Sequence, residues 1–385
     1  MALTLNNFVG FETGGGEEAV ATVGTPEYET GVVRTGGRSL NLNTAVEAYS
    51  IPWVSNVTDA GSGYIFGFGF LRAITSSSAA HVQVLDDAGG VIFSVEADSS
   101  ERLIIKDANG AQLGTATHTL ALDTWAYIEV YAQLNNASAA WEWFVDNVSK
   151  ESGTGADLTD GNAFGSSSSA LKLLGGTEGS GANTTFFDDV YILSGATSAA
   201  DRYGDFAVLA YQTTDGTSTD LGDALENGTW ALVSETPVNE GTSNDAGYAG
   251  TPKTGGTQTD SGTRLGPSGD TRITGTPTVK GAKWIHRLHR GTGGGTTHQK
   301  RYGNSGDGMT NTTVTLSTSY ANFETLSEAA TVVPTLTEYF QQGFNVTGAQ
   351  EITCAEIWGM LGFVPAVVQV DYFPPFPQPV YIARS

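Results

Sequence analysis

The chain is poor in cysteine, in basic residues and in long apolar runs. Its 385 residues contain one cysteine, Cys354, so no internal disulfide can form, which excludes disulfide-stapled scaffolds and cysteine-rich zinc modules. No stretch approaches the roughly 20 consecutive apolar residues of a membrane-spanning helix. The first residues also lack the basic and apolar parts of a secretory leader. We therefore expect a soluble protein, made in the cytoplasm, with no membrane partner.

Positive charge is scarce and unevenly placed. The formal net charge is −23, and residues 1–205 hold 25 Asp and Glu against 8 Lys and Arg. Such an acidic region repels phosphate, which argues against a nucleic-acid partner. Residues 253–301 reverse this balance, with nine basic residues and only two acidic ones. This stretch either neutralises the protein's own acidic surface or contacts an acidic neighbour such as another copy. The candidate assembly residues within it are Lys283, Arg287, Arg290, Lys300 and Arg301.

The composition predicts an all-β protein. The chain has 50 glycines and only 15% charged residues, with short apolar runs between turn-forming segments such as residues 86–90 and 107–110. The length predicts two domains, and the strand pattern breaks near residue 205. We expect a first sandwich over residues 1–205, a second, smaller β-sandwich over residues 206–364 and an extended arm over residues 365–385.

Residues 125–134 show the clearest strand pattern. Ala126, Ile128, Val130, Ala132 and Leu134 alternate with more polar or aromatic residues, as a period of two requires. This alternation predicts that the five named side chains face the core.

Four aromatic residues in neighbouring predicted strands form a candidate glycan-binding surface. Exposed Tyr and Trp rings can stack on the C–H face of a sugar, so Tyr127, Tyr131, Trp141 and Trp143 are the candidate residues. The alternative is that Trp141 and Trp143 belong to the core.

The candidates for chemistry are weaker. Glu96, Asp98 and Glu101 match the E-x-D-x-x-E string of laminarinase-type glucanases, which needs both glutamates on one strand with their carboxyl groups about 5–5.5 Å apart. Here the string falls at a predicted hairpin turn, so we expect no enzyme activity. Asp188 and Asp189 are candidates for a calcium site, although such a pair more often bonds to backbone. We otherwise expect no metal and no cofactor.

The last residues predict an extended segment. Five prolines among aromatic residues exclude a helix after residue 364 and favour a polyproline-like arm. The arm either straps its own domain or docks Tyr372, Phe373 and Phe376 on a neighbouring subunit.

Several short motifs together resemble one family. They are residues 10–14 (GFETG), 33–40 (VRTGGRSL), 124–129 (TWAYIE), 145–148 (VDNV), 187–193 (FDDVYIL), 203–208 (YGDFAV) and 214–216 (TDG). In their order and spacing they resemble the concanavalin A-like, laminin-G-like jelly-roll structural proteins of tailed bacteriophages. The resemblance implies an N-terminal jelly roll, no catalytic residues, and a multimeric component of the virion that is made in the host cytoplasm.

Three hypotheses follow for the function. The first is a tail or fibre-type appendage, taken to be a trimer, whose lectin-like domain contacts host-surface glycans while the second domain and arm bind other virion proteins. The second is a capsid decoration protein, which needs no sugar. The third, a jelly-roll glycan hydrolase, requires Glu96 and Glu101 to share a strand.

Overall fold

The computed structural model describes most of the chain. The described residues are 3–12, 19, 21–44, 47–53, 63–73, 80–86, 89–98, 100, 102–115, 117–134, 138–156, 158, 170–175, 185–212, 216–218, 248–250, 257–263, 270, 272, 273, 275–290, 297–304, 307–317, 321–329, 333–338, 340–347 and 352–366. For some strand residues of the second half only the backbone is described. Residues 367–385, with Tyr372, Phe373 and Phe376, lie outside the described part, so the predicted arm stays a prediction.

The first domain contains an eight-stranded antiparallel sheet. Its strand order is β13-β12-β11-β6-β15-β4-β3, and β1 also pairs with β15. The strands are β1 (Thr4–Val9), β3 (Glu27–Glu29), β4 (Ser39–Leu42), β6 (Gly63–Arg72), β11 (Ala126–Gln133), β12 (Ala139–Val145), β13 (Val148–Ala156) and β15 (Thr185–Ala196).

A seven-stranded sheet completes this domain. Its order is β10-β9-β8-β7-β14-β5-β2. The strands are β2 (Ala21–Val23), β5 (Ala48–Pro52), β7 (Ala80–Leu85), β8 (Val91–Ala97), β9 (Arg102–Asp107), β10 (His118–Thr119) and β14 (Ala170–Leu174).

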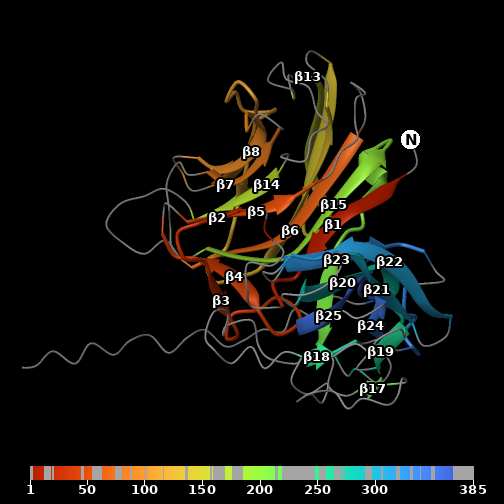
Figure 1. Cartoon of the computed structure of the whole chain (residues 1–385). Coiled ribbons are helices and arrows are strands. Elements are labelled where there is room, and N and C mark those ends of the chain that lie inside the picture. Colours follow the sequence, from red (N-terminus) through yellow and green to blue (C-terminus); the bar gives the residue numbers. More distant parts are fainter. Residues whose placement is uncertain are drawn as a thin grey trace, which may run out of the picture.

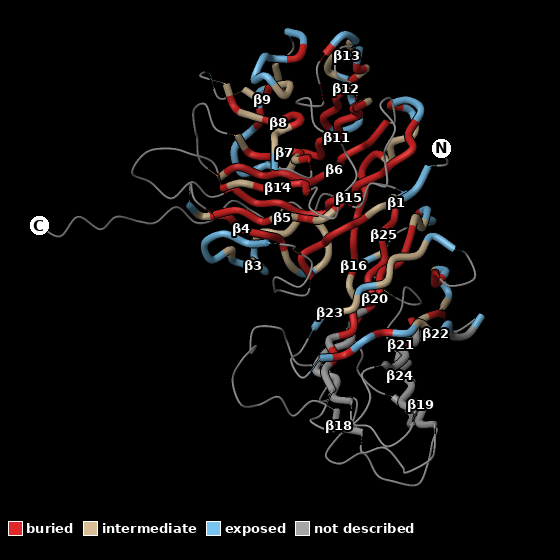
Figure 2. Tube along the Cα trace, turned by 45° about the horizontal axis from the view of Figure 1, so that its top comes forward, coloured by how far each residue is buried: buried red, intermediate tan, exposed pale blue. Residues whose placement is uncertain are grey.

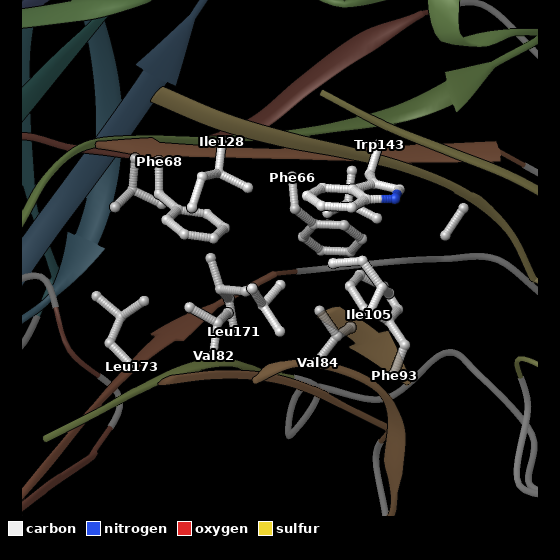
Figure 3. Close-up of a cluster of buried hydrophobic side chains, with 14 of the residues drawn as sticks. Phe66, Phe68, Val82, Val84, Phe93, Ile105, Ile128, Trp143, Leu171 and Leu173 are labelled. Carbon is white, nitrogen blue, oxygen red and sulfur yellow. The ribbon is translucent and has the colours of Figure 1, made fainter. Parts of the chain in front are cut away.

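The two sheets enclose the main hydrophobic core. Side chains of the larger sheet, such as Phe66, Ile128 and Trp143, point toward Val84 and Leu171 of the smaller one (Figure 3). Such interdigitated inner faces are typical of a β-sandwich. The prediction of an all-β sandwich is therefore confirmed.

Strand β11 confirms the predicted alternation. Ala126, Ile128, Val130, Ala132 and Leu134 all belong to this core. Side chains two residues apart point to the same face of a strand, so the sequence pattern was sufficient to orient β11.

Two predicted turns are also confirmed. Between β7 and β8 the N–H of Asp86 donates to the carbonyl oxygen of Gly90 at 2.9 Å, and the Asp86 side chain accepts from the N–H of Gly90 at 2.7 Å. After β9 the N–H of Asp107 donates to the carbonyl oxygen of Ala111 at 2.9 Å, and Gly110 takes a positive φ of 75°. That φ favours glycine, as an Asn-Gly turn predicts.

The second domain consists of two five-stranded sheets. One has the order β16-β25-β20-β23, with β18 also paired to β25, and the other has the order β17-β19-β24-β21-β22. The first comprises β16 (Ala207–Gln212), β18 (Tyr248–Gly250), β20 (Thr278–Arg290), β23 (Ala321–Ser327) and β25 (Ile352–Val364). The second comprises β17 (Gly216–Ser218), β19 (Thr257–Thr263), β21 (Thr297–Asn304), β22 (Gly308–Thr315) and β24 (Phe340–Thr347).

The two domains are stacked, with the eight-stranded sheet lying next to the sheet of β16, β20 and β25 (Figure 1). Figure 2 shows that burial continues from β15 and β1 into β16, β20 and β25. Between β15 and β16 lie a short 3-10 helix (η1, Ala199–Asp201) and the predicted boundary at residue 205. Among the described residues no helix is long or apolar enough to span a membrane.

Candidate functional site

The four aromatic residues predicted to bind glycans are buried. Trp143 is 0% exposed and Trp141 is 6% exposed, and both belong to the core between the two sheets. They lie opposite Val130 and Ala132 of β11, two core-facing residues. The prediction of a sugar-stacking surface needs exposed rings, so for Trp141 and Trp143 it is wrong and the core alternative holds.

Tyr127 and Tyr131 point away from that core but are also buried. They belong to a second hydrophobic cluster that includes Phe206, Ile285 and Met360 of the second domain. The predicted orientation is thus right and the predicted exposure is wrong, because the second domain covers this face of β11. What the sequence marks as an outer face is an interface between the domains.

A buried polar group lies at this interface. We call it the Arg34 cluster, formed by Arg34, Thr35, Asp188, Asp189 and Asp205. The Arg34 guanidinium donates to Asp189 Oδ2 at 2.5 Å, pairs with Asp205 and lies 4.4 Å from the ring centre of Tyr127. All members of the Arg34 cluster therefore precede the predicted boundary, with Asp205 at its last position.

The local structure of β15 aims the two aspartates at this arginine. The pairing of β15 with β6 shifts register between Asp188 and Tyr191, and Asp189 has a positive φ of 50°. A bulge of this kind re-aims side chains that would otherwise alternate between the faces of the sheet. Asp188 accepts from the backbone N–H groups of Arg34 at 2.9 Å and Thr35 at 3.2 Å.

Asp189 also holds the start of the second domain. Its Oδ1 accepts from the N–H of Val208 at 2.7 Å and from the Thr35 hydroxyl at 2.6 Å. The Arg34 side chain in turn donates to the carbonyl oxygen of Phe206 at 2.8 Å. Side chains of the first domain thus fix the backbone with which β16 begins.

Burial sets the protonation of this region. It raises the pKa of Asp188 well above its ordinary value, and the neighbouring Asp189 and Glu12 carboxyl groups raise it further. Burial also raises the pKa of Asp189, although the Arg34 charge opposes the rise. Glu12 accepts from the N–H of Gly37 at 2.9 Å, but burial still raises the pKa of Glu12 to about 8.

A second group, the Glu129 cluster, is formed by Glu129, Tyr191, Arg202, Tyr203 and Gly204. Glu129 accepts from the Tyr191 hydroxyl, from the N–H of Gly204 at 2.8 Å and from Arg202 at 3.4 Å. The N–H of Tyr203 donates to the Tyr191 hydroxyl at 3.1 Å. Burial raises the pKa of Glu129, and the hydrogen bond from Tyr191 offsets part of this rise.

The calcium prediction for Asp188 and Asp189 stays a prediction. In the described part of the chain no three His, Cys, Asp or Glu side chains gather as a metal site requires. Oxygens of both aspartates accept hydrogen bonds from Arg34 and Thr35, in line with the alternative that such a pair bonds to backbone.

Both lysines among the predicted assembly residues are buried. Lys283 is 1% exposed and lies 3.7 Å from Glu324 Oε2, while Lys300 is 4% exposed and donates to the Glu324 carbonyl oxygen at 2.6 Å. Burial lowers the pKa of Lys300 to about 8. As surface contacts for a partner these two residues were predicted wrongly. For Arg287, Arg290 and Arg301 only the backbone, in β20 and β21, is described.

Of the three carboxylates in the glucanase-like string, Glu96 and Asp98 lie within the described residues. Glu96 lies in β8, which extends two residues further than the predicted strand, and binds Lys106 at 2.5 Å and the Ser94 hydroxyl at 2.7 Å. Glu101 lies outside the described residues. The hairpin of β8 and β9 predicted around it is present.

Sequence reasoning gave no role to Glu12, Arg34, Glu129, Arg202 or Asp205. Four of them lie in motifs that carry the family resemblance, at residues 10–14, 33–40, 124–129 and 203–208. Glu129 also had a signal of its own in the sequence. It is the single charged residue between Tyr127 and Tyr131, on the face of β11 that the second domain covers.

Comparison with known proteins shows likeness at the level of structure alone. No family model matches the chain, and no curated protein matches it. Domain 4 of AbnA, a GH43 extracellular arabinanase from Geobacillus stearothermophilus solved with arabinotriose, is similar at 15% identity and a TM-score of 0.37, with 51% of this chain and 96% of that one covered.

Two further solved structures are similar to the same degree. A carbohydrate esterase of the Shiga toxin-encoding bacteriophage phi24B matches at 14% identity and a TM-score of 0.37, covering 51% of this chain and 100% of that one. The cellulose-induced protein Cip1 matches at 17% identity and a TM-score of 0.33, covering 50% and 97%. At these scores the likenesses assign neither an activity nor a ligand to this chain.

Proposed function

We propose that this protein is a non-catalytic structural component of a tailed-phage virion, in which the jelly roll is mounted rigidly on the second domain. The observation that supports this role is the interface built around the Arg34 cluster. Domains joined by an exposed linker move relative to one another unless a large apolar interface holds them. Here the connection is buried, apolar and hydrogen-bonded. Such a rigid connection suits a structural component that must hold its two domains in a fixed orientation.

The apolar side of the interface supports the same role. Phe8, Tyr191 and Phe206 form a contiguous aromatic group, with ring centres 6.0 Å apart for Phe8 and Phe206 and 5.1 Å apart for Tyr191 and Phe206. Edge-on and tilted ring packing of this kind adds about 0.5–1.5 kcal/mol per pair beyond the buried area. The two domains therefore resist separation through packing as well as through charge.

Glycan contact remains a prediction within this proposal. Because Tyr127, Tyr131, Trp141 and Trp143 are buried, any sugar must be recognised by other residues. The proposal therefore places the protein on the particle, with appendage and decoration both retained as positions.

The placement on the virion is tested on the phage that encodes the chain. We expect mass spectrometry of density-purified particles to detect the protein in many copies, and immunogold labelling to place it at one site, on tail or head. A protein absent from purified particles but abundant in the infected-cell lysate would contradict the proposal.

The second test concerns binding and catalysis by the intact protein. We expect a glycan array probed with the full chain to distinguish an appendage, which gives a signal, from a decoration protein, which gives none. Release of reducing sugar from bacterial polysaccharides by the same sample would contradict the non-catalytic role.

A further inference from the structure

The edges of the four sheets are protected to different extents. A sheet edge presents backbone N–H and C=O groups to other chains, and proteins protect edges by short strands, charges, bulges or coverage. In the first domain β2, β3 and β10 are only two or three residues long. Edge strand β13 is longer, but it contains Lys150 and Glu151 and shifts register twice against β12.

Edges of the second domain are protected by other means. The N–H of Val208 in β16 donates to Asp189 of the first domain, and its carbonyl oxygen lies 3.5 Å from the Thr35 hydroxyl. The carbonyl oxygen of Glu324 in β23 accepts from Lys300 Nζ. Strands β17 and β18 have three residues each.

Strand β22 differs from all of these. It runs for eight residues, Gly308–Thr315, without a charged residue or a proline, and pairs with β21 in an unbroken register from Gly308 to Thr315. It ends the strand order of its sheet, and within the described chain β21 is the only strand that pairs with it. Thr310, Thr313 and Thr315 are exposed. This strand is long, regular and uncharged at an edge.

We propose that β22 pairs antiparallel with β22 of a second copy of this chain, so that two five-stranded sheets join into one across a twofold axis. A twofold interface uses the same surface on both subunits, which an antiparallel pair of identical strands satisfies. This inference rests on the geometry of β22 and does not depend on the proposed role in a virion.

The lack of charge on β22 allows a second copy of this acidic chain to be the partner. Each chain carries a formal net charge of −23, so two copies repel one another over most of their surfaces. The β22 edge is a neutral stretch, and opposing threonines across an antiparallel pair contribute roughly 0.2–1 kcal/mol each. It therefore offers main-chain hydrogen bonding without charge repulsion between the paired strands.

The first test is the mass of the full chain in solution by light scattering. We expect twice the 40.2 kDa of one chain at micromolar concentration. The double substitution Thr313→Lys and Thr315→Lys adds two positive charges to exposed positions of this edge, which opposes strand pairing, and should give a monomer.

A matched variant controls for the added charge. Ser152→Lys with Thr154→Lys adds the same two charges to exposed positions of β13, a different edge, and should remain a dimer. A wild-type monomer, a trimer, or a Thr313→Lys, Thr315→Lys variant that keeps the dimer mass would each overturn the proposal.

Hydrogen exchange on the unmodified protein gives an answer that does not depend on a variant folding. We expect amides of β22 to exchange slowly in concentrated protein and at least tenfold faster after dilution, while those of β13 do not change. If the protein is a dimer but the exchange rate of its β22 amides does not change on dilution, the two copies contact each other through another surface.

Discussion

Two arginine–aspartate pairs of the first domain use the same chemistry in different surroundings. The Arg34 and Asp189 side chains are 6% and 0% exposed and lie between the domains. The Arg102 and Asp98 side chains are 43% and 16% exposed and lie at the turn between β8 and β9. Their N–O distances, 2.5 and 2.6 Å, are nearly equal, so geometry alone does not distinguish them.

The difference lies in what happens when one partner is removed. Water solvates the charge left behind at the exposed pair, whereas a buried charge without its partner keeps the full cost of desolvation. Burial, more than distance, therefore decides which ion pair the fold depends on.

The largest expected effect is at Arg34. Arg34→Met removes the cation that faces Asp189 and Asp205 while keeping similar side-chain bulk. We expect the free energy of unfolding to fall by about 3–5 kcal/mol, as for other broken buried pairs. Urea unfolding followed by tryptophan fluorescence measures this loss, and a change below about 1 kcal/mol would contradict the importance of burial.

The next effect is the pH dependence that Glu12 imposes. Its pKa is raised from 4.5 to about 8 in the folded protein, so its contribution to stability is full below pH 4.5 and is lost as the pH rises through 8. Glu12→Gln keeps an acceptor for the Gly37 N–H and removes the titration. Between pH 6.5 and 9 we expect the wild type to lose on the order of 2 kcal/mol relative to this variant.

Calorimetric unfolding at a series of pH values tests this expectation. The buried His81, whose pKa burial lowers to about 3, does not interfere, because its titration is common to the wild type and the variant and cancels in their difference. Parallel wild-type and Glu12→Gln profiles would mean that Glu12 is charged in the folded protein at neutral pH.

A smaller effect is expected at the Glu129 cluster. Tyr191→Phe removes the hydroxyl that donates to Glu129 and accepts from the N–H of Tyr203. We expect a loss of about 1–3 kcal/mol, because the buried carboxylate and N–H lose a partner. Tyr203→Phe is the control, since among the described residues the Tyr203 hydroxyl contacts only the exposed Glu328, at 3.5 Å.

The smallest effect is expected at the exposed pair. Arg102→Met breaks the contact with Asp98, and surface pairs of this kind contribute about 0.2–1 kcal/mol. The same urea measurement used for Arg34 gives the comparison directly. Equal losses at the two arginines would remove the distinction between them.

The fold was largely predictable from the sequence because local patterns of alternation and turn residues specify the strands and hairpins of a β-sandwich. The alternation through Ile128 and Val130, and the turns at residues 86–90 and at Asn109-Gly110, depend only on neighbouring residues. Local patterns state which residues share a face of a strand.

The candidate sites were not predictable in the same way, because a pattern does not state what covers each face. Tyr127 looks exposed in the sequence, but the second domain packs on it. Lys283 looks like a surface charge, but its ammonium nitrogen lies 5.3 Å from the centre of the Phe8 ring and 3.7 Å from Glu324 Oε2. Both errors arise from contacts between segments far apart in the chain.

The packing of the Phe206 and Val208 side chains in one hydrophobic cluster with Phe8 and Tyr191 has a consequence for how such proteins exchange parts. A genetic crossover at residue 205 would pair one parent's Phe8 and Tyr191 with another parent's side chains at positions 206 and 208. Crossovers that preserve folding should therefore fall after residue 208, so that the first domain is inherited together with the opening of the second. The unit of inheritance in this molecule is longer than its first domain.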